Sequence, residues 1–224
     1  MSHFEIEIKT LLGAEASAKD LVLKMQSLDA DLAVAGRSTQ LNHYFTGGDI
    51  QVLYQATEQL FTGEQHDRFQ MIATRGREFS VRTRQKDDEV LLVVKASLDG
   101  GSSANAVSRF EFEEPVTLSL EKLDRLVLQA GYTYQAKWSR ERVEYAYQGI
   151  VVCIDKNAGY GYLAEFETVT DDEDGLPAVR EKLEILMSEL VVTELPQDRL
   201  GRMFEYYNAN WSEYYGTDKT FTIA

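Results

Sequence analysis

Charged residues that alternate within short extended segments are the part of this 224-residue sequence whose side chains could carry out chemistry. Glu5 and Glu7 are two residues apart, as are Glu165 and Glu167. Because successive side chains of a strand point to opposite faces, each pair shares one face, with Cα atoms about 6.6 Å apart at a rise of ~3.3 Å per residue. Both carboxylates of a pair could reach one hard cation, and oxygen-only ligation favours Mg²⁺ or Mn²⁺ over zinc.

Basic residues follow the same alternation. Arg82 and Arg84 share one face of a predicted strand, and Lys95 closes the apolar run 90–94. The planar fork of arginine matches phosphate oxygens, and lysine adds a point charge. Carboxylates, a metal ion and guanidinium groups in one cavity would make a phosphoryl-transfer site, in which positioning and charge stabilisation supply most of the catalysis.

For any single strand the alternative interpretation is a solvated face of an antiparallel sheet, which is the commonest cause of such alternation. Against it, these strands place like charges on neighbouring sites of one face, where their repulsion costs stability. Bound counter-ions would relieve that repulsion, so the whole set favours a binding site.

The elements that must position these residues are predicted from hydrophobic periodicity and turn residues. The connections are short enough for hairpins, so we expect a mostly antiparallel sheet in an α+β fold. Strands are predicted at 3–10, 42–45, 78–84, 90–95, 108–114, 142–147, 149–155 and 162–168, and helices at 15–30, 50–60, 118–130, 177–190 and beyond Pro196. In the helix at 15–30, Leu21, Val22, Met25 and Leu28 recur at helical spacing. No element is predicted with any definition between 60 and 78.

Composition excludes several classes of function. A formal charge of -14 argues against a broad affinity for nucleic acid or anionic membranes. No apolar run approaches the roughly 20 residues of a membrane helix, and the first residues are charged where a signal peptide is apolar, so a cytoplasmic protein is expected. Cys153, the single cysteine, lies in an apolar run, which predicts a buried structural thiol. The three histidines have no metal-ligand spacing, and Tyr44 is expected to pack on the sheet.

The segment Glu5-Ile6-Glu7-Ile8-Lys9 resembles the N-terminal ExExK signature of CYTH proteins, the triphosphate tunnel metalloenzymes. Further blocks follow in the order typical of that family and span about residues 3–170. They are Arg82-Thr83-Arg84, Lys95, Glu111-Phe112-Glu113, Arg140-Glu141-Arg142 with Tyr145, Asp155, and the stretch 159–167 that contains Glu165 and Glu167. Arg140 stands where the family has a lysine, unless Lys137 takes that place. The tail beyond Pro196 has no counterpart in the pattern.

The resemblance implies a closed eight-stranded antiparallel β tunnel with flanking helices, here a domain at 1–195. The residues at 196–224 are rich in aromatic side chains, which predicts a helical extension that packs on this domain. It also implies one Mg²⁺- or Mn²⁺-binding set, with Glu5, Glu7, Glu165 and Glu167 favoured as direct ligands. The predicted metal-binding residues are Glu5, Glu7, Glu111, Glu113, Asp155, Glu165 and Glu167. The predicted substrate-binding residues are Lys9, Arg82, Arg84, Lys95, Arg140 and Arg142. The predicted catalytic residues are Glu5, Glu7, Lys9, Arg82, Arg84 and Lys95.

The function that the resemblance implies is metal-dependent hydrolysis of a small-molecule triphosphate, with inorganic triphosphate favoured over thiamine triphosphate or a nucleotide. A class IV adenylyl cyclase, which converts ATP to cyclic AMP and pyrophosphate, would use the same motifs. A binder of polyphosphate or of a phosphorylated ligand without turnover is the third hypothesis. The repelling carboxylate pairs count against it, since only a metal relieves them. Either a monomer or a homodimer is compatible with the sequence.

Overall fold

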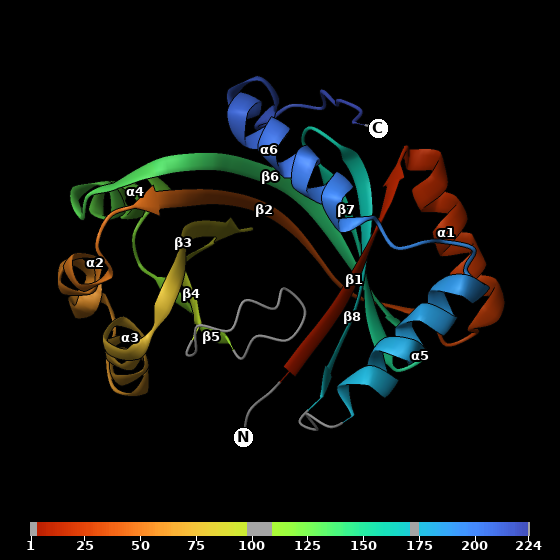
Figure 1. Ribbon diagram of the computed structural model, residues 1–224, viewed down its shortest axis with the longest axis horizontal. Coiled ribbons are helices and arrows are strands. Elements are labelled where there is room, and N and C mark those ends of the chain that lie inside the picture. The colour runs from red at the N-terminus through yellow and green to blue at the C-terminus, as the bar shows by residue number, and fades with distance from the viewer. Residues whose placement is uncertain (1–3, 98–108, 171–174, 224) are drawn as a thin grey trace. The chain divides into compact units, whose positions relative to one another are not determined.

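The structure is a computed structural model that describes residues 4–97, 109–170 and 175–223; for Phe4, Glu5, Arg109 and Phe110 it describes the backbone alone. The chain forms two compact units. We call Met1–Thr39 with Ser139–Ala224 the terminal unit, and Gln40–Trp138 the central unit. Two long strands, β2 (Ala33–Gly47) and β6 (Tyr132–Tyr147), contribute residues to both units (Figure 1).

Eight strands form one sheet in the order β1-β8-β7-β6-β2-β3-β4-β5. The pairs β1–β8, β8–β7, β7–β6, β2–β3, β3–β4 and β4–β5 are all antiparallel. The remaining strands are β1 (Phe4–Gly13), β3 (Arg77–Lys86), β4 (Glu89–Ser97), β5 (Arg109–Val116), β7 (Ile150–Asn157) and β8 (Gly161–Thr170). The predicted α+β fold with eight antiparallel strands is confirmed. Among the described residues β1 and β5 are the two edges, so hydrogen bonds between strands do not close the sheet.

In the terminal unit, one face of the sheet carries the apolar core. The helices α1 (Glu15–Leu28) and α5 (Leu176–Glu189) both contact β1 and β8 on that face. Side chains that are at most 1% exposed fill this core, among them Ile8, Met25, Val152, Phe166 and Leu183. Leu28, for which helical spacing predicts an inward position, is 48% exposed because it is the last residue of α1.

The tail of the chain packs in the same unit. Helix α6 (Gln197–Tyr214) buries Met203, Tyr207 and Tyr214. Beyond it, the backbone of Gly159 between β7 and β8 accepts a hydrogen bond from Phe221 N–H and donates one to the carbonyl of Lys219, at 2.5 and 3.0 Å. Gly159 has φ +94°, and a Cβ there would lie 2.6 Å from the Tyr207 ring. Only glycine fits this position, both sterically and conformationally.

In the central unit, three α-helices and a short 3₁₀ helix cover the apolar face of the sheet. They are α2 (Ile50–Thr57), η1 (Glu58–Leu60), α3 (Glu64–Arg75) and α4 (Leu120–Gln129). Leu53, Phe69, Phe112, Leu123 and Val127 are fully buried between these helices and the strands.

Helix α3 lies in the segment where the sequence predicts no defined element. Only Phe69, Ile72 and Ala73 of its twelve residues are buried, so its apolar stripe is too narrow to stand out from the polar sequence around it. The strand β6 begins at Tyr132, ten residues before the predicted start, and therefore includes Arg140. No helix within the described parts of the chain is both long and apolar enough to cross a lipid bilayer.

Candidate functional site

The sheet face of the terminal unit that lies opposite its apolar core is lined with charge. Strand register brings the residues together: Glu7 opposes Glu167, and Lys9 opposes Glu165. Across the next two ladders, Cys153 opposes Glu165 and Arg142 opposes Asp155. Because opposed residues share a face, the side chains of these residues lie on one surface. Among the described residues, the charged side chains and the thiol on this face are Glu7, Lys9, Arg140, Arg142, Glu144, Cys153, Asp155, Glu165 and Glu167.

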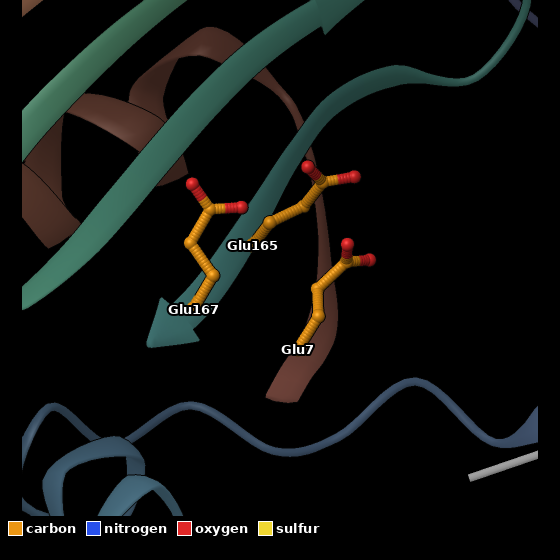
Figure 2. A group of neighbouring side chains, drawn as sticks. All are labelled: Glu7, Glu165 and Glu167. Atoms are coloured by element: carbon orange, nitrogen blue, oxygen red, sulfur yellow. The ribbon is translucent and has the colours of Figure 1, made fainter. Parts of the chain in front are cut away.

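Three glutamates from β1 and β8 form a carboxylate cluster on this face. One oxygen each from Glu7, Glu165 and Glu167 lies within 4.8 Å of the other two (Figure 2). Glu165 is only 7% exposed, Glu167 is half-buried and Glu7 is exposed. An oxygen-only donor set of this density suits a hard divalent cation, which would relieve the repulsion among the three charges.

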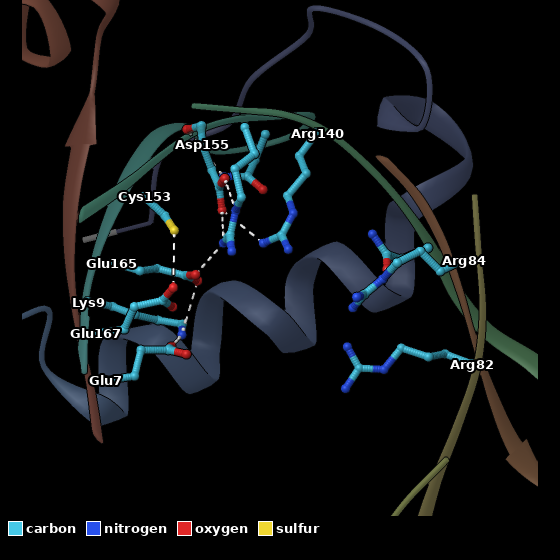
Figure 3. Close-up of polar contacts among 12 residues, drawn as sticks. Glu7, Lys9, Arg82, Arg84, Arg140, Cys153, Asp155, Glu165 and Glu167 are labelled. Atoms are coloured by element: carbon cyan, nitrogen blue, oxygen red, sulfur yellow. Dashed lines mark hydrogen bonds and ion pairs between the residues drawn. The ribbon is translucent and has the colours of Figure 1, made fainter. Parts of the chain in front are cut away.

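Two cations contact the buried member of the cluster. The Lys9 ammonium lies 3.1 Å from Glu165 Oε1 and also contacts Glu7, while the Arg142 guanidinium contacts the second oxygen of Glu165 (Figure 3). Burial alone would raise the pKa of Glu165, but the charges of Lys9, Arg142 and Arg140 outweigh it and lower the pKa to about 2. Glu165 is therefore ionised at neutral pH, which is the state that a metal ligand requires.

Asp155 is engaged by arginines. Arg142 donates through Nε and Nη2 to its two oxygens at 2.7 Å each, and Arg140 donates through Nη1 at 2.8 Å. Burial favours the neutral form of Arg142, yet its hydrogen bonds with Asp155 and the charge of Glu165 raise the pKa of the guanidinium above its ordinary value. Asp155 is 1% exposed and, within the described residues, is not part of the three-glutamate cluster. It holds the two arginines in place on this face.

Sequence reasoning missed two residues of this face. Cys153 is buried, as predicted, but its thiol lies on the charged face and donates to Glu167 Oε1 at 3.4 Å, whereas its neighbours Val152 and Ile154 enter the apolar core. Burial raises the pKa of the Cys153 thiol well above its ordinary value. The other missed residue is Glu144, which opposes Cys153 across the β6–β7 ladder. Period-two alternation from Asp155 and Arg142 would have found both.

Room for Glu144 is provided by a glycine on β2. A Cβ at Gly36 would lie 3.2 Å from Oε2 of Glu144, which is tighter than ordinary van der Waals contact. Gly36 has no side chain to compete for this space, so the Glu144 carboxylate lies over the backbone of β2.

The central unit has its own charged face, on β2, β3, β4 and β5. Arg84 donates from Nε to Asn42 at 2.7 Å and from Nη1 to Glu113 at 2.5 Å. Arg82 donates to the Tyr44 hydroxyl at 3.0 Å and lies over the Tyr44 ring, 4.8 Å from its centre. Tyr44 therefore orients an arginine in addition to packing on the sheet.

The other predicted residues in this unit also form ion pairs. Lys95 Nζ lies 2.8 Å from Glu111 Oε1, so Glu111 and Glu113 both contact basic side chains in the structure. Lys137, the alternative to Arg140 in the sequence pattern, lies over the ring of Tyr134 at 4.2 Å.

The Glu5 side chain is outside the described residues, although its backbone opposes Val169 on β8.

Comparison with known proteins matches the model of the CYTH domain family to residues 62–198 of this chain. No curated protein gives a significant sequence match. Among solved structures, a conserved hypothetical protein from Pyrococcus furiosus has 18% identity and a TM-score of 0.58, with 85% of this chain and 93% of that chain covered. A suggested adenylate cyclase from Vibrio parahaemolyticus has 18% identity and a TM-score of 0.55, with 86% and 91% covered.

A third similar structure is HpAC1 from Hippeastrum, a suggested adenylyl cyclase described as having a dominant triphosphatase activity. It has 16% identity and a TM-score of 0.51, with 91% of this chain and 96% of that chain covered. At these identities the three structures show that the fold is shared.

Proposed function

Since the chain belongs to the CYTH domain family, we propose that it hydrolyses a small-molecule triphosphate with a divalent metal ion, and that inorganic triphosphate is its preferred substrate. The observation that supports this proposal most is the cluster of Glu7, Glu165 and Glu167 beside Lys9 and Arg142 on one sheet face. Metal-binding carboxylates next to phosphate-binding cations are what cleavage of a phosphoanhydride requires.

Glu7, Glu165 and Glu167 are the residues that would hold the metal. Their oxygens converge within 4.8 Å, and the donor set contains no nitrogen or sulfur, so Mg²⁺ and Mn²⁺ fit it better than zinc does. A bound divalent ion would neutralise phosphate oxygens and lower the pKa of a coordinated water molecule. The adjacent cation Lys9 would bind phosphate oxygens that approach the cluster.

Five further basic side chains are proposed to contact phosphate: the guanidinium groups of Arg82, Arg84, Arg140 and Arg142 and the ammonium of Lys95. A carboxylate, amide or phenol already fixes the direction of each of these cations. Pre-organised donors of this kind need little reorganisation when a charged substrate binds, which is the origin of their catalytic effect.

Hydrolysis is favoured over cyclisation because the Hippeastrum protein of the same fold has a dominant triphosphatase activity. The deciding experiment incubates the protein with Mg²⁺ or Mn²⁺ and with either inorganic triphosphate or ATP, and identifies the products. Release of orthophosphate from triphosphate is the expected result. Formation of cyclic AMP and pyrophosphate from ATP would identify a cyclase, and tight triphosphate binding without any product would identify a non-catalytic binder.

A further inference from the structure

A buried polar network lies in the central unit, on the sheet face that packs against the helices. Its centre is Asp124 of α4, which is 4% exposed. Oδ1 of Asp124 accepts a hydrogen bond from the hydroxyl of Thr83 at 2.6 Å. Oδ2 accepts from the Tyr134 hydroxyl at 2.6 Å and lies 2.7 Å from Nδ1 of His43. Thr83 is fully buried, His43 is 5% exposed and Tyr134 is half-buried, so the carboxylate of Asp124 is largely shielded from water.

The carboxylate of Asp124 connects three strands. Thr83 belongs to β3, His43 to β2 and Tyr134 to β6. The hydrogen bonds with Thr83 and His43 are buried and the one from Tyr134 is half-buried, and a carboxylate with three short hydrogen bonds in a low-dielectric environment is strongly held. One residue of α4 therefore sets the positions of three neighbouring segments of the sheet.

Ionisation of Asp124 is what allows this arrangement. Burial alone would raise the pKa of Asp124, but the hydrogen bonds from His43, Thr83 and Tyr134 outweigh it and hold the pKa below its ordinary value. An ionised carboxylate is only an acceptor, so all three partners must donate, including Nδ1–H of His43.

The strand register relates this network to the charged face. His43 opposes Thr83, and the two flanking cross-strand pairs are Asn42 with Arg84 and Tyr44 with Arg82. Side chains alternate between the two faces of the sheet. Asp124 therefore binds the middle pair, His43 and Thr83, on the face that packs against the helices, and the two flanking pairs lie on the charged face. Those flanking pairs are the ones in which Asn42 and Tyr44 hydrogen-bond the two arginines.

We propose that Asp124 is a positioning residue for phosphate binding, which acts by fixing the β2–β3 segment that presents Arg82 and Arg84. This inference rests on the proposed function, in which these arginines bind the triphosphate. A small shift of β3 against β2 would move both guanidinium groups away from their Asn42 and Tyr44 partners. Loss of the outer-shell groups that orient metal ligands typically costs about 10- to 100-fold, and we expect an effect of the same order for a group that orients phosphate-binding arginines.

The test compares Asp124→Asn with Leu123→Ala, a neighbouring variant in the same helix. Leu123 is fully buried in the apolar core and takes no part in the polar network, so its truncation lowers stability without removing a hydrogen bond. For each variant we would measure the melting temperature, the Kd for triphosphate by calorimetry, and kcat and KM well below the melting temperature. We expect Asp124→Asn to raise Kd and KM about tenfold or more, and Leu123→Ala to change them less than about twofold.

Two further variants keep the test decisive if Asp124→Asn does not fold. Thr83→Val and Tyr134→Phe each remove one donor and should raise KM by smaller factors. In a background of Arg82→Lys with Arg84→Lys, the additional effect of either variant should largely disappear, because the groups being positioned are gone.

Two results would overturn the inference. If the wild-type protein cleaves triphosphate and the Asp124, Thr83 and Tyr134 variants keep wild-type Kd and KM, the network is only structural. The same conclusion holds if Leu123→Ala raises KM as much as Asp124→Asn does. A wild-type protein that neither binds nor cleaves triphosphate overturns the proposed function, and the positioning role with it.

Discussion

Lys9 and Glu165 are direct cross-strand partners on β1 and β8, and the Lys9 ammonium lies 3.1 Å from the Glu165 carboxylate. Lys9 also contacts Glu7, so one positive charge lies among the three glutamates of the cluster. It offsets part of their repulsion in the absence of a metal. In the proposed function, the same ammonium would also bind a phosphate that approaches the cluster.

Replacing Lys9 by methionine should therefore have opposite effects on the two ligands. Divalent metal should bind several-fold more tightly, because the cluster gains net negative charge, whereas the KM for triphosphate should rise about tenfold or more. Titration of Mn²⁺ followed by electron paramagnetic resonance measures the first effect, and steady-state kinetics measures the second. Lys156→Met is the matched control, because Lys156 on β7 pairs with Glu141 and Asp218 away from the charged face. Weaker Mn²⁺ binding in Lys9→Met would contradict the assigned position of the metal.

The double substitution Glu7→Gln with Glu167→Gln removes two of the three converging carboxylates. We expect turnover to fall roughly 100-fold or more and Mn²⁺ binding to be lost, because amide oxygens carry no charge. The melting temperature without metal should stay equal or rise, since two repelling charges are removed. Glu141→Gln serves as the control, because its side chain is exposed on β6 and lies at 3.5 Å from Lys156. Full activity in the double variant would rule out this cluster as the metal site.

Asp155→Asn should be strongly destabilising. Asp155 accepts hydrogen bonds from both Arg140 and Arg142 and is 1% exposed, so its loss removes the carboxylate that the two guanidinium groups share and leaves Arg142, among the described residues, with Glu165 as its one remaining carboxylate partner. Breaking a buried ion pair in this way costs about 3–5 kcal/mol. The free energy of unfolding in urea measures the effect, and Asp218→Asn, at an exposed ion pair, should leave the unfolding midpoint unchanged. A midpoint for Asp155→Asn equal to that of the wild type would show that the arginines do not depend on Asp155.

Cys153 should be unreactive in the native protein. Burial raises the pKa of the thiol, so the folded protein favours the neutral form. The resulting contribution to the free energy of unfolding is fully present below the thiol pKa of the unfolded chain, and it is lost as the pH rises through the higher pKa of the folded state. The thiolate is the reactive species, so labelling by iodoacetamide at pH 8 should be at least about 100-fold slower in the native protein than in urea. The chain has one cysteine, so mass spectrometry reads the modification directly. Rapid native labelling would show that the thiol is accessible from the charged face.

The parts of the site that could be predicted from the sequence are those controlled by local alternation. Glu165 and Glu167 share a face whatever their surroundings, and so do Arg82 and Arg84. What alternation cannot supply is register, because a shift of one residue between β1 and β8 would move Glu7 to the other face. The family motif supplied that information for the charged residues.

The network around Asp124 could not be predicted, because its members show no pattern in sequence. Asp124 lies on a helix, 81 residues from His43, and its sequence context does not distinguish it from the other polar residues of that amphipathic helix. Its partners His43 and Thr83 are brought together by strand pairing, and helix packing brings Asp124 to them. Helix α3 was missed for a related reason, since three buried side chains give too weak a periodic signal.

The pairing of β1 with β8 has a consequence for the order in which the protein is made. Phe4 opposes Thr170, so the first strand leaves the ribosome roughly 10–30 s before its partner, at ~5–20 residues per second. The central unit is one continuous stretch of chain and can form during that interval. The carboxylate cluster cannot form in that interval, because Glu7 can pair with the strand of Glu165 and Glu167 only after the β8 segment has been synthesised. Until then β1 is unpaired along both of its edges, and the nascent chain lacks the assembled carboxylate cluster.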